Sequence, residues 1–436
     1  MRRFQVIVVG AAGLAALAIA RPARAQEPRR VTLDEAIQIA VRTQPIMVQA
    51  RQDLRVAEAQ GRQTLAAYLP SLNASGNTAK SSTTRIDATT QKPVDFPSQY
   101  SSTVGLTANW NIFTGLRRGA QHSSANATTD QRDATLRRRE YSIVLSTKQA
   151  FFLALKNFAL VNVQQTRLRR ADEQLKLTTE RLRLGATTRS DSLRARVEYG
   201  NAQLALITAQ NDLRNAQASL ARQLQVDGLV MAAYDSALEV RLPPLDTATL
   251  MREALASAPS VREADATVNA AQASKNVFRA DYFPTISLNG GYNFVASDQI
   301  IAGGQYLPTW NFRLAFTYQL FNNLTRETNR VTSDASLQSA IALSRDARLA
   351  VSTSLTQWAA ALEAAAAKID VSQVSVAASE EDLRMQRERY RLGAVTIIEV
   401  LTSQASLDQA QVDLVQARYD YLVARAQIEA VVGHAL

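Results

Sequence analysis

The sequence predicts a mixed α and β fold with an internal structural duplication, in which long helices pack as coiled coils and four strands per chain form part of a shared transmembrane β-barrel. Three observations predict it. One long unit occurs twice, two long windows contain neither glycine nor proline, and shorter segments alternate apolar and polar residues. Helices have a period of 3.6 residues and strands a period of two, so these patterns separate the helical segments from the strands.

The duplication is visible in residues 181–191, Arg-Leu-Arg-Leu-Gly-Ala-Thr-Thr-Arg-Ser-Asp, which return at 389–399 as Arg-Tyr-Arg-Leu-Gly-Ala-Val-Thr-Ile-Ile-Glu. The offset is 208 positions (389 − 181), and Phe113 and Phe321 keep the same offset. A long unit repeated once predicts a pseudo-symmetric architecture. We expect a first repeat at 26–230, with a strand hairpin at about 69–113 and a helical hairpin at about 115–226. The second repeat is expected at 231–436, with hairpins at about 284–321 and 323–432.

Residues 1–25 have the three parts of a secretory signal peptide: Arg2 and Arg3, an apolar run, and a small-residue site that ends at Ala25. An uncleaved N-terminal membrane anchor is the alternative, although the apolar run is shorter than the roughly 20 residues of a spanning helix. Removing residues 1–25 removes four arginines, so the formal charge falls from +10 to +6.

The composition excludes several classes of function. The arginines are spread among acidic residues, which argues against a nucleic-acid partner. The chain has no cysteine, so disulfides and thiolate metal sites are excluded, and its two histidines, His122 and His434, are far apart. We therefore expect no metal, no cofactor and no catalytic residues, which makes an enzyme the least favoured class.

The windows without glycine and proline span roughly residues 116–184 and 324–392. Because both residue types interrupt helices, each window predicts one helix, about 100 Å long at 1.5 Å per residue. Gly185 and Gly393 suit the left-handed position that closes a helix, and Ser190 or Thr396 is a candidate cap for the returning helix. Large and small residues repeat every seven positions in both returning helices, which predicts coiled-coil packing over ordinary amphipathic packing. In the second copy these residues are Val400, Leu407, Leu414, Tyr421 and Ile428, with Ser403, Ala410, Ala417, Ala424 and Val431.

Strands are predicted at 104–112 and 310–320, each with a weaker partner, at 72–76 and 286–294, across polar loops at roughly 78–101 and 296–308. The strand lengths and aromatic ends fit a transmembrane barrel, and a soluble β-sandwich is the alternative. Four strands cannot close a barrel, and an open edge in lipid leaves backbone groups unpaired, so the barrel must be shared between chains. Two chains would give eight strands, and three would give twelve and begin to leave a lumen. The aromatic residues placed for the membrane interface are Tyr68, Phe113, Tyr282, Phe283 and Phe321.

The order of these segments resembles the TolC family of outer-membrane efflux and secretion channels over nearly all of the chain after residue 25. The most specific stretch runs from Arg389 to Leu401. The resemblance implies a homotrimer, with a twelve-stranded barrel in the lipid of the cell outer membrane that continues as a long α-helical coiled-coil barrel through the periplasm. It also implies docking to a periplasmic adaptor (membrane fusion) protein and an inner-membrane transporter. The implied function is the exit duct of a tripartite efflux pump or a type I secretion system. A structural periplasmic coiled-coil or adhesin protein is the alternative.

In this family the helical hairpin tips close the periplasmic entrance, and Tyr390, Asp191 and Glu399 match positions of that gate. Val395 and Thr402 depart from the family pattern, in which an arginine and a second acid stand there, so we expect a partial latch with one entrance acid per chain. Asp191 and Glu399 also suit the first turn of a helix, and Tyr390 suits packing before a turn. The expected adaptor-docking residues at the tips are Gly185, Ala186, Thr187, Gly393, Ala394 and Val395.

Overall fold

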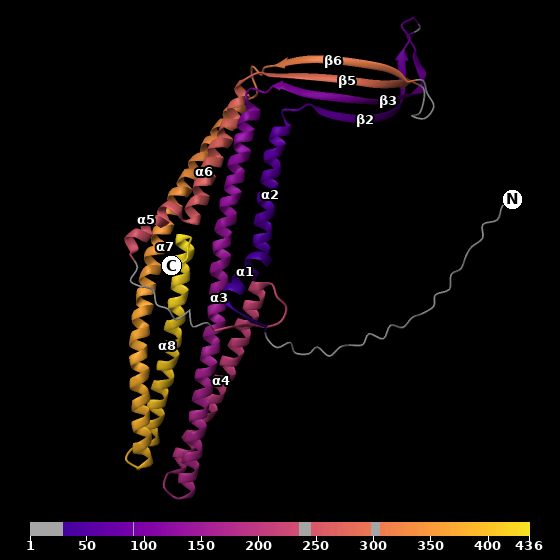
Figure 1. The fold of residues 1–436 in the computed structure, drawn as a ribbon. Helices are drawn as coiled ribbons and strands as arrows, with labels where there is room; N and C mark the ends of the chain where they lie inside the picture. The colour runs from indigo at the N-terminus through magenta and orange to yellow at the C-terminus, as the bar shows by residue number, and fades with distance from the viewer. Residues whose placement is uncertain (1–28, 90, 235–245, 298–305) are drawn as a thin grey trace, which may run out of the picture.

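The computed structural model describes residues 29–89, 91–234, 246–297 and 306–436 (Figure 1). The expected signal peptide at 1–25, and residues 298–305 of the second expected loop, lie outside these residues. Two long helical hairpins run side by side, and a four-stranded sheet extends from one end of them (Figure 1). The turns of both helical hairpins lie at the opposite end, where they form two neighbouring tips.

The helical hairpins are built from α3 (Arg117–Arg183) with α4 (Arg189–Leu224), and from α7 (Thr325–Arg391) with α8 (Ile397–Val432). The helices α3 and α7 each have 67 residues, and α4 and α8 each have 36. Each helix end in the second copy lies 208 positions after its counterpart (325 − 117, and likewise for the other three). Equal lengths on both sides of the turn place the two tips at the same level.

The sheet contains β2 (Ser71–Ile86), β3 (Pro93–Phe113), β5 (Thr285–Ser297) and β6 (Leu307–Thr317), in that order and all antiparallel. Apolar residues pair across the strands, for example Leu106 with Tyr292, and Tyr292 with Trp310. Since side chains alternate between faces, these pairs fall on one face of the sheet. That face is exposed in the single chain, as the exposed residues Leu72, Leu106, Trp110, Tyr292, Trp310, Phe312, Leu314 and Phe316 show.

The first loop is shorter than the sequence suggested. Residues 78–101 were expected to be a loop, but β2 continues to Ile86 and β3 begins at Pro93. The pairing continues from Thr78 with Ser102 to Ile86 with Pro93, interrupted by one register shift. Threonine is favoured in strands because of its branched Cβ, and the backbone ladder does not need apolar side chains to continue. Low hydrophobicity therefore indicated solvent exposure here and not the end of the strand.

Shorter elements lie alongside α3 and α7, from the middle of the molecule to the end near the sheet (Figure 1). They are β1 (Arg29–Val31), paired in parallel with β4 (Val230–Ala232), together with α1 (Leu33–Thr43), α2 (Pro45–Ala66), α5 (Thr247–Ser257), α6 (Pro259–Phe278) and the 3₁₀ helix η2 (Arg279–Tyr282). The largest of the buried clusters lies near the middle of α3, where Phe151 and Leu155 pack with residues of α1, α4 and α8. A second core joins α5, α7 and α8 around Leu355 and Ile428.

In the part of the chain that the structure describes, none of the helices combines the length and the apolar character needed to cross a membrane.

Candidate functional site: the hairpin tips

The two tips have the same backbone geometry. Gly185 and Gly393 have φ angles of +72° and +77°, in the left-handed region that glycine adopts without strain. The N–H of Ala186 bonds to Arg181 O and that of Ala394 to Arg389 O, both at 2.8 Å, which closes each helix in a Schellman motif. A Cβ on either glycine would meet nothing within 4 Å. Glycine is therefore favoured here by the φ angle, and not by crowding.

The turn of the first copy is closed by a capping box. Thr188 is the N-cap of α4, where its hydroxyl accepts from the N–H of Asp191 at 3.2 Å, and the Asp191 carboxylate accepts from the N–H of Thr188 at 3.4 Å. Ser190 was the expected cap, but it lies inside the helix, because the residue whose backbone is extended before the first turn is Thr188. In the second copy Thr396 is the N-cap, and its side chain makes no capping bond.

The structure brings Tyr390 and Asp191 into one hydrogen-bonded chain through Thr187. The Thr187 hydroxyl donates to Asp191 Oδ2 at 2.9 Å and lies 3.5 Å from the hydroxyl of Tyr390. Because Thr187 has a single hydroxyl proton, which it gives to Asp191, Tyr390 is the donor to Thr187. Tyr390 is only 4% exposed. Its ring packs in a core formed by both helical hairpins, with Ala195, Leu383, Ile397, Val400 and Leu407.

The carboxyl group of Asp191 has a lowered pKa. Burial acts to raise it, but hydrogen bonds from Thr187 and from the side chain and backbone of Thr188 oppose this effect, as does the charge of Arg194, and together they hold the pKa below its usual value of 3.8. Asp191 is therefore a charged acceptor at neutral pH. Glu399 is exposed on the first turn of α8, and no cation pairs with it among the described residues.

Arg181 is a residue of this site that the sequence did not single out. Its Nη1 donates to Tyr390 O at 2.5 Å and to Arg391 O at 3.3 Å, while Nη2 donates to Ala186 O at 3.4 Å. The guanidinium group also lies over the Tyr390 ring, 4.9 Å from its centroid. The only signal in the sequence was the arginine at this place in both copies of the repeated segment.

A second polar cluster joins the two helical hairpins farther from the tips. Asp408 of α8 accepts from Arg170 Nη2 at 2.5 Å and pairs with Arg167 Nε at 3.1 Å, and Arg167 also pairs with Glu198 of α4 at 2.8 Å. Burial raises the pKa of the Asp408 carboxyl, while Arg170 and Arg167 act to lower it. Arg170 precedes Arg181 by 11 residues, so the cluster lies about 16 Å along the helix from the tip contacts. Sequence reasoning missed it because these residues lie far apart in the chain.

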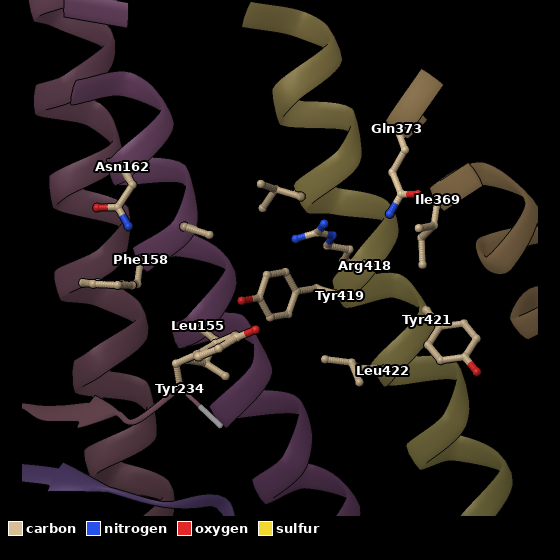
Figure 2. A pocket seen from close by; sticks show the side chains of 12 residues that line it. Leu155, Phe158, Asn162, Tyr234, Ile369, Gln373, Arg418, Tyr419, Tyr421 and Leu422 are labelled. Carbon is tan, nitrogen blue, oxygen red and sulfur yellow. The ribbon is translucent and has the colours of Figure 1, made fainter. Parts of the chain in front are cut away.

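A cavity of about 520 Å³ lies between α3, α7 and α8 (Figure 2). Phe158 and Asn162 of α3 face Arg418, Tyr419 and Leu422 of α8 across it, with Tyr234 at its edge (Figure 2). The walls are mainly aromatic and aliphatic. The described residues contain no group of three or more histidine, aspartate or glutamate side chains placed to hold a metal ion.

At the other end of the long helices, the expected interface aromatics surround the junction of strands and helices. Tyr282, Phe283 and Phe321 are exposed there, and Phe113 is the last residue of β3. Tyr68 is also exposed. Two equivalent arginines, Arg118 and Arg326, lie over the rings of Tyr68 and Tyr282, at 4.5 and 5.1 Å from the centroids. Both copies therefore place an aromatic ring and a cation together at the same end of the sheet.

Comparison with known proteins gives the family. The family model described as outer membrane efflux protein matches residues 36–224 and 250–434. The outer membrane efflux protein BepC of Brucella suis biovar 1 is 24% identical over 403 residues, which cover 90% of this chain and 83% of BepC. The toluene efflux pump outer membrane protein TtgC of Pseudomonas putida is 25% identical over 427 residues, which cover 92% of this chain and 83% of TtgC. The crystal structure of the CmeC outer membrane channel of Campylobacter jejuni has the same fold, with a TM-score of 0.78 at 16% identity, covering 92% of this chain and 85% of CmeC.

Long duplicated helical hairpins joined to a four-stranded sheet thus define a channel protein of the outer membrane. The chain belongs to the outer membrane efflux protein family. The resemblance to TolC-family channels, first drawn from the repeated segments, is confirmed, and the structural coiled-coil or adhesin alternative is not favoured.

Proposed function

We propose that three copies of this chain assemble into a passive exit duct, which carries substrates from the periplasm and an inner-membrane transporter to the cell exterior. The proposal rests mainly on the exposed apolar face and the outer strands of the four-stranded sheet. Its apolar face is exposed, and its outer strands, β2 and β6, each have one paired edge within the described chain. Unpaired strand edges in lipid are costly, so β6 of one copy must pair with β2 of the next. Three copies give twelve strands, which begin to leave a lumen.

The hairpin tips are the periplasmic entrance in this proposal. The long helices extend about 100 Å from the sheet, and the two tips of each chain end at the same level. Tyr390, Thr187 and Asp191 link the first tip to the second, and this link favours a closed entrance. Glu399 supplies one exposed carboxylate per chain, so a trimer has three at its entrance.

The tips are also the docking surface for a periplasmic adaptor (membrane fusion) protein of a tripartite efflux pump. The expected docking residues are Gly185, Ala186, Thr187, Gly393, Ala394 and Val395. To these we add Leu184 and Leu392, which are 76% and 84% exposed beside the two glycines. Large apolar side chains this exposed at both tips favour burial against a partner. The relative TtgC is the outer membrane protein of a toluene efflux pump, which supports efflux as the role of the duct.

The opposite end meets the outer-membrane lipid. Tyr68, Tyr282, Phe283 and Phe321 are exposed at the junction of strands and helices, at the level where a membrane interface would begin. Tyrosine rings favour this level because one end is apolar and the other is hydrated. Arg118 and Arg326 keep the rings of Tyr68 and Tyr282 in place by cation–π contact.

The proposal is tested by purifying the protein from outer-membrane fractions, measuring the mass of the assembly and recording single channels in planar bilayers. We expect a trimer with a cation-sensitive conductance. The Glu399→Ala channel should lose much of its block by a trivalent cation, and the Tyr390→Phe channel should open more often. A soluble product without conductance would refute the duct, and variants identical to the parent would refute the role of the tips.

A further inference from the structure

We propose that Arg181 is the residue that holds the two tips of one chain together and so sets the threshold for opening the entrance. This inference rests on the proposed function, since it assigns the regulation of the same site. Arg181 closes the first hairpin, yet most of its contacts lie on the second. A side chain that bridges both tips must release one of them before they can separate.

Arg181 combines hydrogen bonds from a charged group with a cation–π contact, and both kinds of contact are strong ones. The guanidinium group donates to Tyr390 O and Arg391 O, which belong to the last turn of α7, and to Ala186 O in its own turn. The C-terminal end of a helix carries a partial negative charge, so a cation there is favourable. A planar guanidinium group can engage several carbonyl oxygens while it stacks on an aromatic ring. One side chain therefore combines charge, hydrogen bonds and ring contact between the tips.

Among the described residues, the neighbouring arginines Arg389, Arg183 and Arg391 have hydrogen bonds or ion pairs only within their own helices. Arg389, the counterpart of Arg181 in the second copy, donates to Gln386 on its own helix. Arg183 and Arg391 pair with Glu180 and Glu388, again on their own helices and with exposed side chains. Within the described part of the chain, the other polar link between the tips is the Thr187–Tyr390 hydroxyl pair, which at 3.5 Å is long and involves no charge.

Separation of the tips would expose side chains that Arg181 helps to keep buried. Tyr390 is buried in the core that contains Ala195 of the first hairpin and Val400 of the second, and Arg181 covers the ring. Separation of the tips therefore exposes Tyr390 and Val400 together. Because hydrogen bonds from a charged group are stronger than neutral ones, loss of the clamp should raise the open population about tenfold.

The experiment compares Arg181→Gln, Arg181→Lys and the matched control Arg183→Gln in the full-length trimer. The natural chain has no cysteine, so Val400→Cys, at a fully buried position, adds a single reporter for labelling by a maleimide. We expect Arg181→Gln to raise the open probability and the labelling rate about tenfold. Arg183→Gln should match the parent. Arg181→Lys should lie between them, because lysine keeps the charge but cannot bridge the carbonyls and stack.

Two measurements separate a specific clamp from general damage. The mass of the trimer and its thermal unfolding midpoint should be unchanged in Arg181→Gln, and its effect on opening should exceed that of Tyr390→Phe, which removes only the hydroxyl contact. Parental opening and labelling in Arg181→Gln would overturn the inference while leaving the duct intact. Equal effects of Arg181→Gln and Arg183→Gln would overturn it too, because they would indicate a response to net charge. A parent protein without conductance would instead refute the proposed function.

Discussion

Arg170 and Asp408 lie 238 positions apart in the sequence, and Arg170 Nη2 is 2.5 Å from Asp408 Oδ1 in the folded chain. Their side chains are 12% and 7% exposed, so this ion pair joins the two helical hairpins away from water. Removing one partner of a buried pair leaves the other charge uncompensated, which typically costs about 3–5 kcal/mol. We expect Asp408→Asn to destabilise the protein by about 3 kcal/mol and to lower its thermal unfolding midpoint.

The matched control for Asp408 is an exposed pair within one helix. Arg384→Gln removes the contact between Arg384 and Glu381, both of which are exposed on α7. Solvent weakens such exposed pairs, so the thermal unfolding midpoint of Arg384→Gln should hardly differ from that of the parent. Equal midpoints for Asp408→Asn and Arg384→Gln would contradict a stabilising role for the buried cluster.

The two helix starts at the tips predict unequal effects of equivalent substitutions. Thr188→Ala removes the capping box of α4 and should cost about 1 kcal/mol of stability. Thr396→Ala, at the same place in the second copy, removes no capping bond and should cost little. Ser190→Ala should also be mild. Unfolding midpoints of the three variants test this order, and equal losses at Thr188 and Thr396 would show that the capping bonds do not matter.

The lowered pKa of Asp191 predicts a latch that resists mild acid. A carboxyl group whose folded pKa lies below its unfolded value of 3.8 stabilises the fold fully above that value, and the stabilisation is lost as the pH falls through the folded pKa. We expect the open probability of the parent to stay constant from about pH 7 to pH 4 and to rise below pH 4. Asp191→Asn should open more readily throughout and lose much of the rise. A parent latch that fails near pH 6 would contradict this assignment.

Two glycines with similar backbone angles should differ in their tolerance of a side chain. Gly115, at φ +61°, stands where a Cβ would lie 2.7 Å from Phe283 Cβ and 2.8 Å from Ala280 O. We expect Gly115→Ala to cost about 3 kcal/mol, because steric overlap adds to backbone strain. At Gly185, at φ +72°, a Cβ meets no neighbour, so alanine should cost about 1 kcal/mol. Comparable unfolding midpoints for the two variants would argue against the close contact at Gly115.

Much of the helical architecture follows from local rules. Each window without glycine and proline is filled by one helix, Arg117–Arg183 and Thr325–Arg391. Glycine and proline are the residues that most strongly interrupt helices. The seven-residue pattern of α8 also identifies its packed face, since Val400, Leu407 and Ile428 are buried. Local rules were less reliable at the ends of elements. The capping residue Thr188 and the extended β2–β3 hairpin depended on backbone geometry that composition does not specify.

The sequence by itself determined the duplication, the equal lengths of the helical hairpins and the turns at Gly185 and Gly393, because periodicity and backbone propensity act between residues close in the chain. The tertiary structure alone decided which side chains meet across the two copies. Arg181 contacts the carbonyl of Tyr390, 209 positions away, and Arg170 contacts Asp408. Such contacts depend on how two helical hairpins align side by side, which is set by the packing of both hairpins as a whole and not by any local pattern. For that reason the sequence located the tips, and only the folded chain showed how they are held together.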